Sequence, residues 1–302
     1  MTSAWLDTDR HIGHVGVLMG ADNGKYPNGN SVLVRGSHGT VMIDPSLSLV
    51  ERGGVPADHI DHVLISHAHE DHFCGTHMCG TPTVNIHAAD HPGVASLEGF
   101  LKIYGLSPGV QAQWEAEILS KFHFTPRPDA CSFEDGAVFD LGGVTVRVIH
   151  LPGHTRGHCG FLIEPDGVFF VADIDLSAFG PYYGDHWSDL EDFERSIEAC
   201  RHIDAKHYVT FHHKGVVDGR ADFVAALDRF AAVIPDREAR MLAYLADPHS
   251  IEEMAMHRFI YRPGVSLMFT DDVERTSARM HVNRLLRDGG VIEIEPGLFR
   301  AA

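Results

Sequence analysis

Residues 65–72 read Ile65-Ser66-His67-Ala68-His69-Glu70-Asp71-His72, which places four potential metal ligands within six positions. In an extended chain, side chains two residues apart point to the same side, so His67 and His69 can face one metal ion. Asp71 and His72 follow where the chain is expected to turn, and they can face a second ion. A loop that is rich in histidine by chance is the competing interpretation, but it does not predict further ligands at the ends of later strands.

Further potential ligands do follow the later strands that the sequence predicts. They are His154 after residues 144–149, Asp173 after residues 168–172, and His212 and His213 after residues 207–211. Binding sites in layered α/β folds collect at one end of a sheet, so side chains from these separate strand ends are expected to meet. The sequence therefore predicts one metal centre built from four strand ends.

Hydrophobic patterning predicts a mixed order of strands and helices. Strands are expected at residues 31–35, 40–43, 62–66, 82–86, 144–149, 160–163, 168–172 and 207–211. Helical periodicity appears at residues 94–104, 111–122, 188–202 and 222–233. Ser188 and Glu191 have the spacing of a capping box, which predicts the start of the third helix. The clustering of early strands before the first helices suggests stacked sheets with helices outside.

The pattern His-x-His-x-Asp-His, met by His67, His69, Asp71 and His72, resembles the metallo-β-lactamase superfamily. The resemblance covers roughly residues 10–235, and it implies an α/β fold of four layers, an αββα sandwich with its metals at one rim. By this resemblance, His67, His69 and His154 would hold the first metal ion. Asp71, His72 and His212 would hold the second, and Asp173 would bridge both.

Imidazole and carboxylate ligands without a thiolate favour two zinc ions, with Mn²⁺ or Fe²⁺ as alternatives. Two such ions can hold a bridging water and lower its pKa towards ~7, which makes hydroxide available as a nucleophile. Asp71, besides being a ligand, can orient that hydroxide or receive its proton. No serine or cysteine nucleophile is needed.

Two ligand positions depart from the usual pattern of the family. The last ligand is ambiguous because His212 and His213 are adjacent, and alternation at a strand end lets one of them face the metals; we predict His212. His158 stands where many relatives have a small residue, and it contacts either the substrate, the ligands or the protein core. Asp44 resembles the family aspartate that orients ligand histidines, and we expect that role for it; a turn aspartate before Pro45 is the alternative.

The segment after Asp173 is expected to border the active-site cleft. Within it, the phenol of Tyr182 or Tyr183 can donate to a developing oxyanion, which makes both tyrosines candidate catalytic residues beside Asp71. Packing of a loop by aromatic rings is the alternative. Residues 100–114 are likewise expected to cover the pocket with apolar side chains.

The pattern changes after Pro235, which predicts a catalytic domain over residues 1–235 and an appendage over residues 236–302. Helices near residues 236–245, 251–256 and 272–287, followed by a hairpin at 291–294 and 298–300, resemble a winged helix. The appendage holds nine Arg, no Lys and eleven Asp or Glu, so it lacks the basic surface of a nucleic-acid reader. We expect it to serve packing or dimerisation, which leaves a homodimer open.

Composition limits the partners and the compartment. The formal net charge of −18 disfavours nucleic acid and anionic membranes, so a small-molecule substrate is expected. No run approaches the ~20 apolar residues of a membrane helix. Five scattered cysteines argue against a disulfide framework, and the N-terminus lacks a secretory pattern, so a cytoplasmic location is expected.

The resemblance defines the chemistry better than the substrate. A winged-helix-like tail on this core resembles the glyoxalase II-like group, so hydrolysis of a small thioester, ester or lactone is our first prediction. A ribonuclease or other phosphodiesterase would use the same ligands, and an iron-dependent oxidoreductase is the alternative from another class. The net charge counts against the ribonuclease or phosphodiesterase. The iron-dependent oxidoreductases of the family add a flavin domain, for which the chain length leaves no room.

Overall fold

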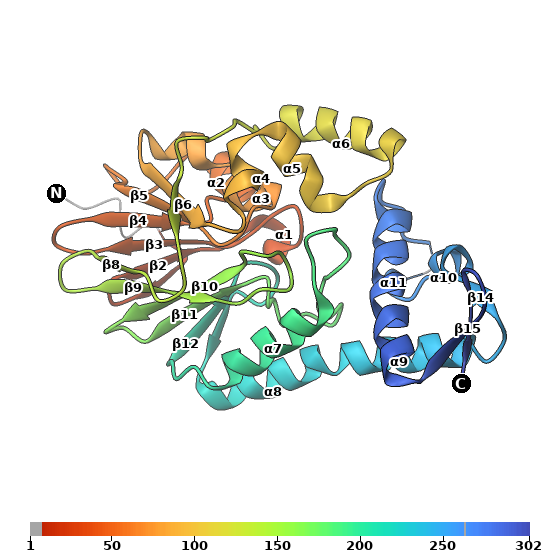
Figure 1. Ribbon diagram of the computed structural model, residues 1–302. Helices are drawn as coiled ribbons and strands as arrows, with labels where there is room; N and C mark the ends of the chain where they lie inside the picture. Colours follow the sequence, from red (N-terminus) through yellow and green to blue (C-terminus); the bar gives the residue numbers. More distant parts are fainter. Residues whose placement is uncertain (1–7, 263) are drawn as a thin grey trace.

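Two stacked β-sheets form the centre of the protein (Figure 1), as seen in a computed structural model that describes residues 8–262 and 264–302. The first sheet follows the chain order, with strands β1 (Arg10–Ile12), β2 (Val15–Leu18), β3 (Ser31–Arg35), β4 (Thr40–Ile43), β5 (His62–Ile65), β6 (Thr83–His87) and β7 (Cys131–Phe133). The second sheet has the order β13-β12-β11-β10-β9-β8, with strands β8 (Val138–Asp140), β9 (Thr145–His150), β10 (Cys159–Glu164), β11 (Val168–Ala172), β12 (His207–Thr210) and β13 (Val216–Asp218).

The core between the two sheets follows from the alternation of side chains along their strands. Val32 and Val34 of β3 face Val146 and Val148 of β9 within one fully buried apolar cluster. Because successive side chains of a strand point to opposite faces, the intervening residues, such as Leu33, pack outward against helices. Both faces of both sheets are therefore covered, and the predicted αββα sandwich is confirmed.

Helices cover the outer face of each sheet (Figure 1). Over the first sheet and its rim lie α1 (Ala21–Gly24), α2 (Leu47–Glu51), α3 (Glu70–Phe73), the 3₁₀ helix η2 (Thr76–Cys79), α4 (His91–Ala95), α5 (Leu97–Tyr104) and α6 (Pro108–Ser120). Over the second sheet lie α7 (Leu190–Arg201) and α8 (Arg220–Ala231). Within the described residues, none of the helices has the length and apolar character to cross a membrane.

The strand ends that carry the expected ligands share one rim of the sandwich. Strands β4, β5 and β6 are mutually parallel, as are β11 and β12, and β9 runs antiparallel to β10, which is antiparallel to β11. The carboxyl ends of β4, β5, β9, β11 and β12 therefore point to the same side. The segments that directly follow these strand ends contain Asp44, His67, His154, Asp173 and His212.

Two helix predictions were wrong in detail. The helix expected over residues 94–104 is broken into α4 and α5, because Ser96 is extended and its hydroxyl oxygen accepts the Gly99 N–H. The expected capping box of Ser188 does not form. Asp189 instead caps α7 by accepting the Asp192 N–H, which leaves the Ser188 hydroxyl to donate to the carbonyl of His154.

The C-terminal region has its own small core, formed by Met241, Met254, Val282 and Leu285 among others. Its elements are α9 (Val233–Tyr244), β14 (His249–Ser250), α10 (Ile251–His257), α11 (Thr270–Asp288), β15 (Val291–Glu295) and β16 (Leu298–Ala301). These are the predicted three helices and hairpin, with β14 added beside β16. The domain boundary predicted after Pro235 lies inside α9, so a continuous helix joins the two regions.

Candidate metal centre

Three imidazole nitrogens meet at the rim of the sandwich. His67 Nε2 lies 2.9 Å from His69 Nδ1, His69 Nδ1 lies 3.0 Å from His154 Nε2, and His154 Nε2 lies 3.1 Å from His67 Nε2. The triangle is close to the edge of about 3.3 Å that tetrahedral zinc with nitrogen ligands requires. We call these three histidines the first ligand set.

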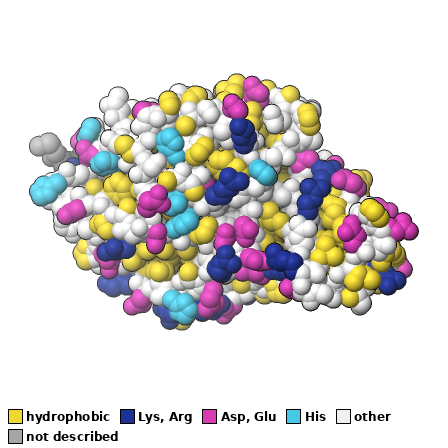
Figure 2. Space-filling view, in the orientation of Figure 1, with side chains coloured by type: hydrophobic (Ala, Val, Ile, Leu, Met, Phe, Trp, Pro, Cys, Tyr) yellow, Lys and Arg dark blue, Asp and Glu magenta, His cyan; other side chains and the backbone are white. Residues whose placement is uncertain are grey.

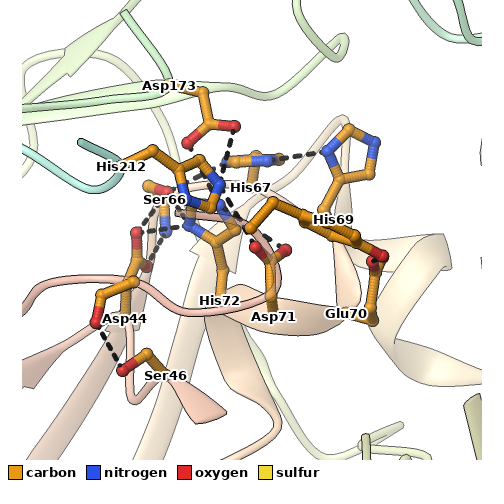
Figure 3. A network of polar contacts seen from close by, with 12 residues as sticks. Asp44, Ser46, Ser66, His67, His69, Glu70, Asp71, His72, Asp173 and His212 are labelled. Carbon is orange, nitrogen blue, oxygen red and sulfur yellow. Dashed lines mark hydrogen bonds and ion pairs between the residues drawn. The ribbon is translucent and has the colours of Figure 1, made fainter. Parts of the chain in front are cut away.

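A second ligand set, Asp71, His72 and His212, lies beside the first (Figure 3). His212 Nε2 is 3.2 Å from Asp71 Oδ2. Asp173 lies between the sets, with Oδ2 3.2 Å from His154 Nε2 and Oδ1 3.1 Å from His72 Nε2. The structure therefore brings together all seven predicted ligands and gives Asp173 the position of a bridge.

The residues fit a pair of metal ions because their inward atoms lack other partners. His72 Nε2, Asp71 Oδ2 and Asp173 Oδ1 are buried and make no hydrogen bond within the described residues, and their ion-pair contacts are with other members of the ligand sets. Buried polar atoms in folded proteins are almost always satisfied by a hydrogen bond or a metal ion. Nitrogen and carboxylate donors without sulfur suit zinc and similar divalent ions.

Asp44 and Ser66 hold the ligands from behind. Asp44 accepts the Ser66 N–H at 2.7 Å and contacts His72 Nδ1 at 2.8 Å, while the Ser66 hydroxyl lies 3.1 Å from His67 Nδ1. Such outer contacts orient metal-bound imidazoles, as the sequence led us to expect for Asp44. Its backbone φ of 45° is rare for aspartate, which indicates that the surrounding structure imposes this position.

Asp90, which the sequence analysis missed, ties the first ligand set together. Its carboxylate accepts the Ala68 N–H at 3.0 Å, the Thr155 hydroxyl at 2.6 Å and the Gly157 N–H at 2.7 Å. One buried side chain thereby joins the loop of His67 and His69 to the turn that carries His154. Asp90 lies outside every motif of the sequence, so local pattern provides no signal for it.

The ambiguous histidines have distinct places. His212 belongs to the second ligand set, whereas the side chain of His213 is 37% exposed and approaches Asp175 at 3.9 Å. His158 is buried, with Nδ1 2.9 Å from the Leu151 carbonyl oxygen and Nε2 accepting the Asp173 N–H at 3.2 Å. Burial lowers the pKa of His158 to about 3, which keeps it neutral as this acceptor. It supports the bridging aspartate from outside the ligand sets.

Glu70 is the second residue that sequence reasoning left without a role. It is buried beside Asp71, and its carboxylate accepts the hydroxyl of Tyr26 at 2.8 Å and that of Tyr104. Burial and the neighbouring Asp71 raise the pKa of Glu70 to about 7. The ring of Tyr104 stacks on His69 at 5.4 Å, so part of the segment expected to cover the pocket does reach a ligand.

The two candidate catalytic tyrosines point in opposite directions. The Tyr182 hydroxyl donates to Asp185 at 3.1 Å, and its ring lies 5.7 Å from that of His154. Tyr183 is buried, and its hydroxyl lies 3.0 Å from His281 Nε2 in the C-terminal region. The structure thus brings Tyr182 to the first ligand set and directs Tyr183 away from it. The oxyanion role of both tyrosines stays a prediction.

Electrostatics of the centre favour cations. Burial alone would lower the pKa of His212, but the carboxylates of Asp173 and Asp71 outweigh it and raise that pKa to about 10. The pKa of His72 is raised well above its ordinary value in the same way, against burial, by Asp173 and Asp44. Without a bound metal ion, protons on His72 and His212 supply the positive charge that these carboxylates favour.

A family model of the metallo-β-lactamase superfamily matches residues 25–213, the segment that holds every ligand. The chain belongs to this superfamily. Among its solved members, a metallo-β-lactamase family protein from Thermus thermophilus shares the fold with a TM-score of 0.70 at 20% identity, covering 96% of this chain and 99% of that one. A β-lactamase domain protein from Burkholderia ambifaria superposes with a TM-score of 0.68 at 17% identity, covering 100% and 94%.

Several relatives have names that state an activity, among them a thioesterase and a hydrolase. The chain is 27% identical over 172 residues to the atrochrysone carboxyl ACP thioesterase of Emericella nidulans, covering 54% of this chain and 45% of that protein. It is 27% identical over 213 residues to the hydroxyacylglutathione hydrolase of Methylococcus capsulatus, covering 69% and 70%. The chain therefore spans less than half the length of the first of these relatives.

Proposed function

We propose that this chain is a dinuclear metal-dependent hydrolase of small-molecule thioesters, with esters and lactones as neighbouring substrates. The observation that carries the proposal is the pair of ligand sets joined by Asp173, in which buried donor atoms lack other partners. The thioesterase and the hydroxyacylglutathione hydrolase among its relatives act on thioesters, which supports this bond type. Zinc is the metal we propose first, on its preference for imidazole and carboxylate ligands.

Two divalent ions held there would supply a water of lowered pKa as the nucleophile and would polarise the substrate carbonyl. The chain's own residues do the positioning. Asp173 spans both ligand sets, Asp44 orients His72, and Asp71 faces the same space as His212. The ring of Tyr182 lies 5.7 Å from that of His154, and we propose its phenol as the donor to the substrate oxygen.

Surface charge supports a small substrate over a nucleic acid. Figure 2 shows Lys and Arg side chains scattered among Asp and Glu on the displayed face, without a continuous basic surface. With a formal net charge of −18, the protein repels a polyanion at long range.

The test is a metal analysis joined to a hydrolysis screen of the full chain. We expect about two zinc ions per chain and chelator-sensitive cleavage of hydroxyacylglutathione or acyl-pantetheine thioesters. Asp173→Asn serves as the inactive control, because it weakens the bridge while keeping the shape of the side chain. Cleavage of bis(4-nitrophenyl) phosphate alone would replace our proposal with a phosphodiesterase, and bound iron with oxygen consumption would replace it with an oxidoreductase.

A further inference from the structure

The segment between β11 and α7, residues 174–189, contacts the first ligand set from outside; we call it the outer loop. His154 Nδ1 donates to the carbonyl oxygen of Tyr182 at 2.8 Å, and His69 Nε2 lies 3.0 Å from Asp185 Oδ2. In both histidines the other ring nitrogen belongs to the ligand triangle. The outer loop therefore contacts the outward ring nitrogen of two of the three imidazoles, His154 through a hydrogen bond to a backbone carbonyl and His69 through an ion-pair contact with a carboxylate.

The opposite side of the outer loop is held by Arg237 of α9, in the C-terminal region. Its side chain is 1% exposed, and the guanidinium donates to the carbonyl oxygens of Pro181 at 2.6 Å and Phe179 at 2.7 Å. Its central carbon also lies 5.3 Å from the rings of Phe179 and Tyr183. The Glu274 carboxylate interacts electrostatically with Arg237, but the hydrogen bonds of the guanidinium go to the two backbone carbonyls, so this contact places the backbone of the outer loop.

The acceptor of His154 and one acceptor of Arg237 are the carbonyl groups of adjacent residues, Tyr182 and Pro181. The Pro181 carbonyl shares a planar peptide unit with the Tyr182 nitrogen, so only the φ and ψ angles of Tyr182 separate the acceptor of Arg237 from the acceptor of His154. On either side of Tyr182 the outer loop packs closely against the C-terminal helices. A Cβ at Gly180 would lie 2.5 Å from Val233 of α9, and one at Gly184 would lie 2.2 Å from Val273 of α11.

We infer that Arg237 is a positioning residue of the metal centre, through which the C-terminal region fixes the Tyr182 carbonyl and thereby His154. The role concerns metal binding and holds whichever acyl group the enzyme accepts. It assigns to the C-terminal region a task beyond packing, because an outer contact of the first ligand set is then held in place by a residue outside the segment that matches the superfamily.

The experiment compares Arg237→Met with Met241→Ala in the full chain. Met241 lies one turn further along α9 and is fully buried in the separate core of the C-terminal region. Its truncation should therefore destabilise that region and leave the contacts between Arg237 and the outer loop in place. Zinc affinity is measured by competition with a chromophoric chelator, and the fold of each metal-free variant is checked by circular dichroism and thermal unfolding.

We expect Arg237→Met to weaken the binding of one zinc ion by roughly 10- to 100-fold, the usual effect of losing an outer contact of a ligand. Met241→Ala should keep zinc affinity within about twofold at a comparable loss of melting temperature. Wild-type zinc affinity in folded Arg237→Met would overturn the inference, as would an equal loss in Met241→Ala. If Arg237→Met does not fold, Arg237→Lys is measured instead, because a single ammonium group cannot reproduce the paired hydrogen bonds of the guanidinium to two carbonyl oxygens. Unchanged zinc affinity in Arg237→Lys would overturn the inference as well.

Discussion

At the scale of single residues, the metal centre depends on which of two adjacent side chains of the same type faces the ligand sets. Adjacent residues with the same chemistry can have opposite fates, because only one of two neighbours at a strand end faces the rim. His212 and His213 are such a pair just after β12, and Tyr182 and Tyr183 are a second adjacent pair, in the outer loop, whose hydroxyls contact Asp185 and His281 respectively. Each pair offers a matched comparison in which the neighbour serves as the control.

His212→Ala is expected to lose one of two bound zinc ions and at least 100-fold in turnover, since the second ligand set then keeps only Asp71, His72 and the shared Asp173. His213→Ala should keep both ions, because His213 lies away from the ligand sets and is 37% exposed in its side chain. Metal content after gel filtration and steady-state thioester hydrolysis measure both. Loss of an ion in His213→Ala would reverse the ligand assignment.

Tyr182→Phe is expected to lower kcat by about 10- to 100-fold with little change in KM, if its hydroxyl stabilises the developing oxyanion. Tyr183→Phe removes a buried hydrogen bond to His281 that is directed away from the ligands, so it should lower thermal stability and leave kcat unchanged. Kinetics of the two variants under saturating metal separate the roles. Full turnover in Tyr182→Phe would leave only a packing role for its ring.

Metal binding is expected to release protons. The pKa of His212 is raised to about 10, so this histidine is protonated at neutral pH without metal and an incoming ion must displace its proton; the pKa of His72 is shifted in the same direction. Affinity for zinc should therefore rise with pH until the pKa of about 10 of His212 is reached. A weakly buffered indicator assay during zinc addition measures the release; its absence would show that these histidines are neutral in the metal-free protein.

At the scale of elements, turns and strand ends place the ligands. The turn before His154 uses Gly153 at a φ of 124°, with its α-carbon so close to α7 that a Cβ would lie 2.1 Å from the Phe193 nitrogen. Asp189 caps α7, and the hydroxyl of the preceding Ser188 donates to the carbonyl of His154. Element ends, more than element centres, therefore determine the geometry of the site.

Gly153→Ala is expected to destabilise the fold by about 3 kcal/mol or more, from backbone strain together with a clash against backbone that cannot move aside. Gly143→Ala is the control, because Gly143 also has a positive φ, of 84°, but has open space around its α-carbon. It should cost about 1 kcal/mol. Denaturant unfolding of both variants provides the comparison, and equal losses would mean that the close approach to α7 contributes nothing.

At the scale of the whole molecule, the C-terminal region packs against the sandwich through charged side chains as well as through the outer loop. Arg284 of α11 donates to Glu194 of α7 at 2.7 Å and to Glu238 of α9 at 2.9 Å, and its side chain is 14% exposed. Arg287, three residues further along α11, pairs with Glu191 at a side-chain exposure of 61%. The two arginines span the same interface at different depths.

Arg284→Ala is expected to lower the free energy of unfolding by about 2 kcal/mol, because it leaves two partly buried carboxylates without their cation. Arg287→Ala should have little effect, since exposed ion pairs are screened by water and salt. Equilibrium unfolding in urea at low and moderate salt measures both. A similar small effect for both variants would show that burial of Arg284 adds nothing to this interface.

The sequence by itself determined the class of fold and the metal ligands. Short apolar runs such as those of β5, β11 and β12 predict buried strands, and ligands follow the ends of these strands, so local composition and spacing suffice to predict them. The strand expected over residues 168–172 matches β11 residue for residue. His-x-His-x-Asp-His is likewise local, because an extended stretch and one turn hold its four ligands.

Only the tertiary structure decided which distant residues support those ligands. Asp90, Asp185 and Arg237 belong to no ligand motif, and each acts through contacts with segments far away in the sequence. The break at Ser96 and the cap at Asp189 were decided in the same way, since propensity favours the alternatives almost equally and packing selects between them. Spacing along the chain encodes a ligand, whereas the contact that orients it depends on how remote elements pack.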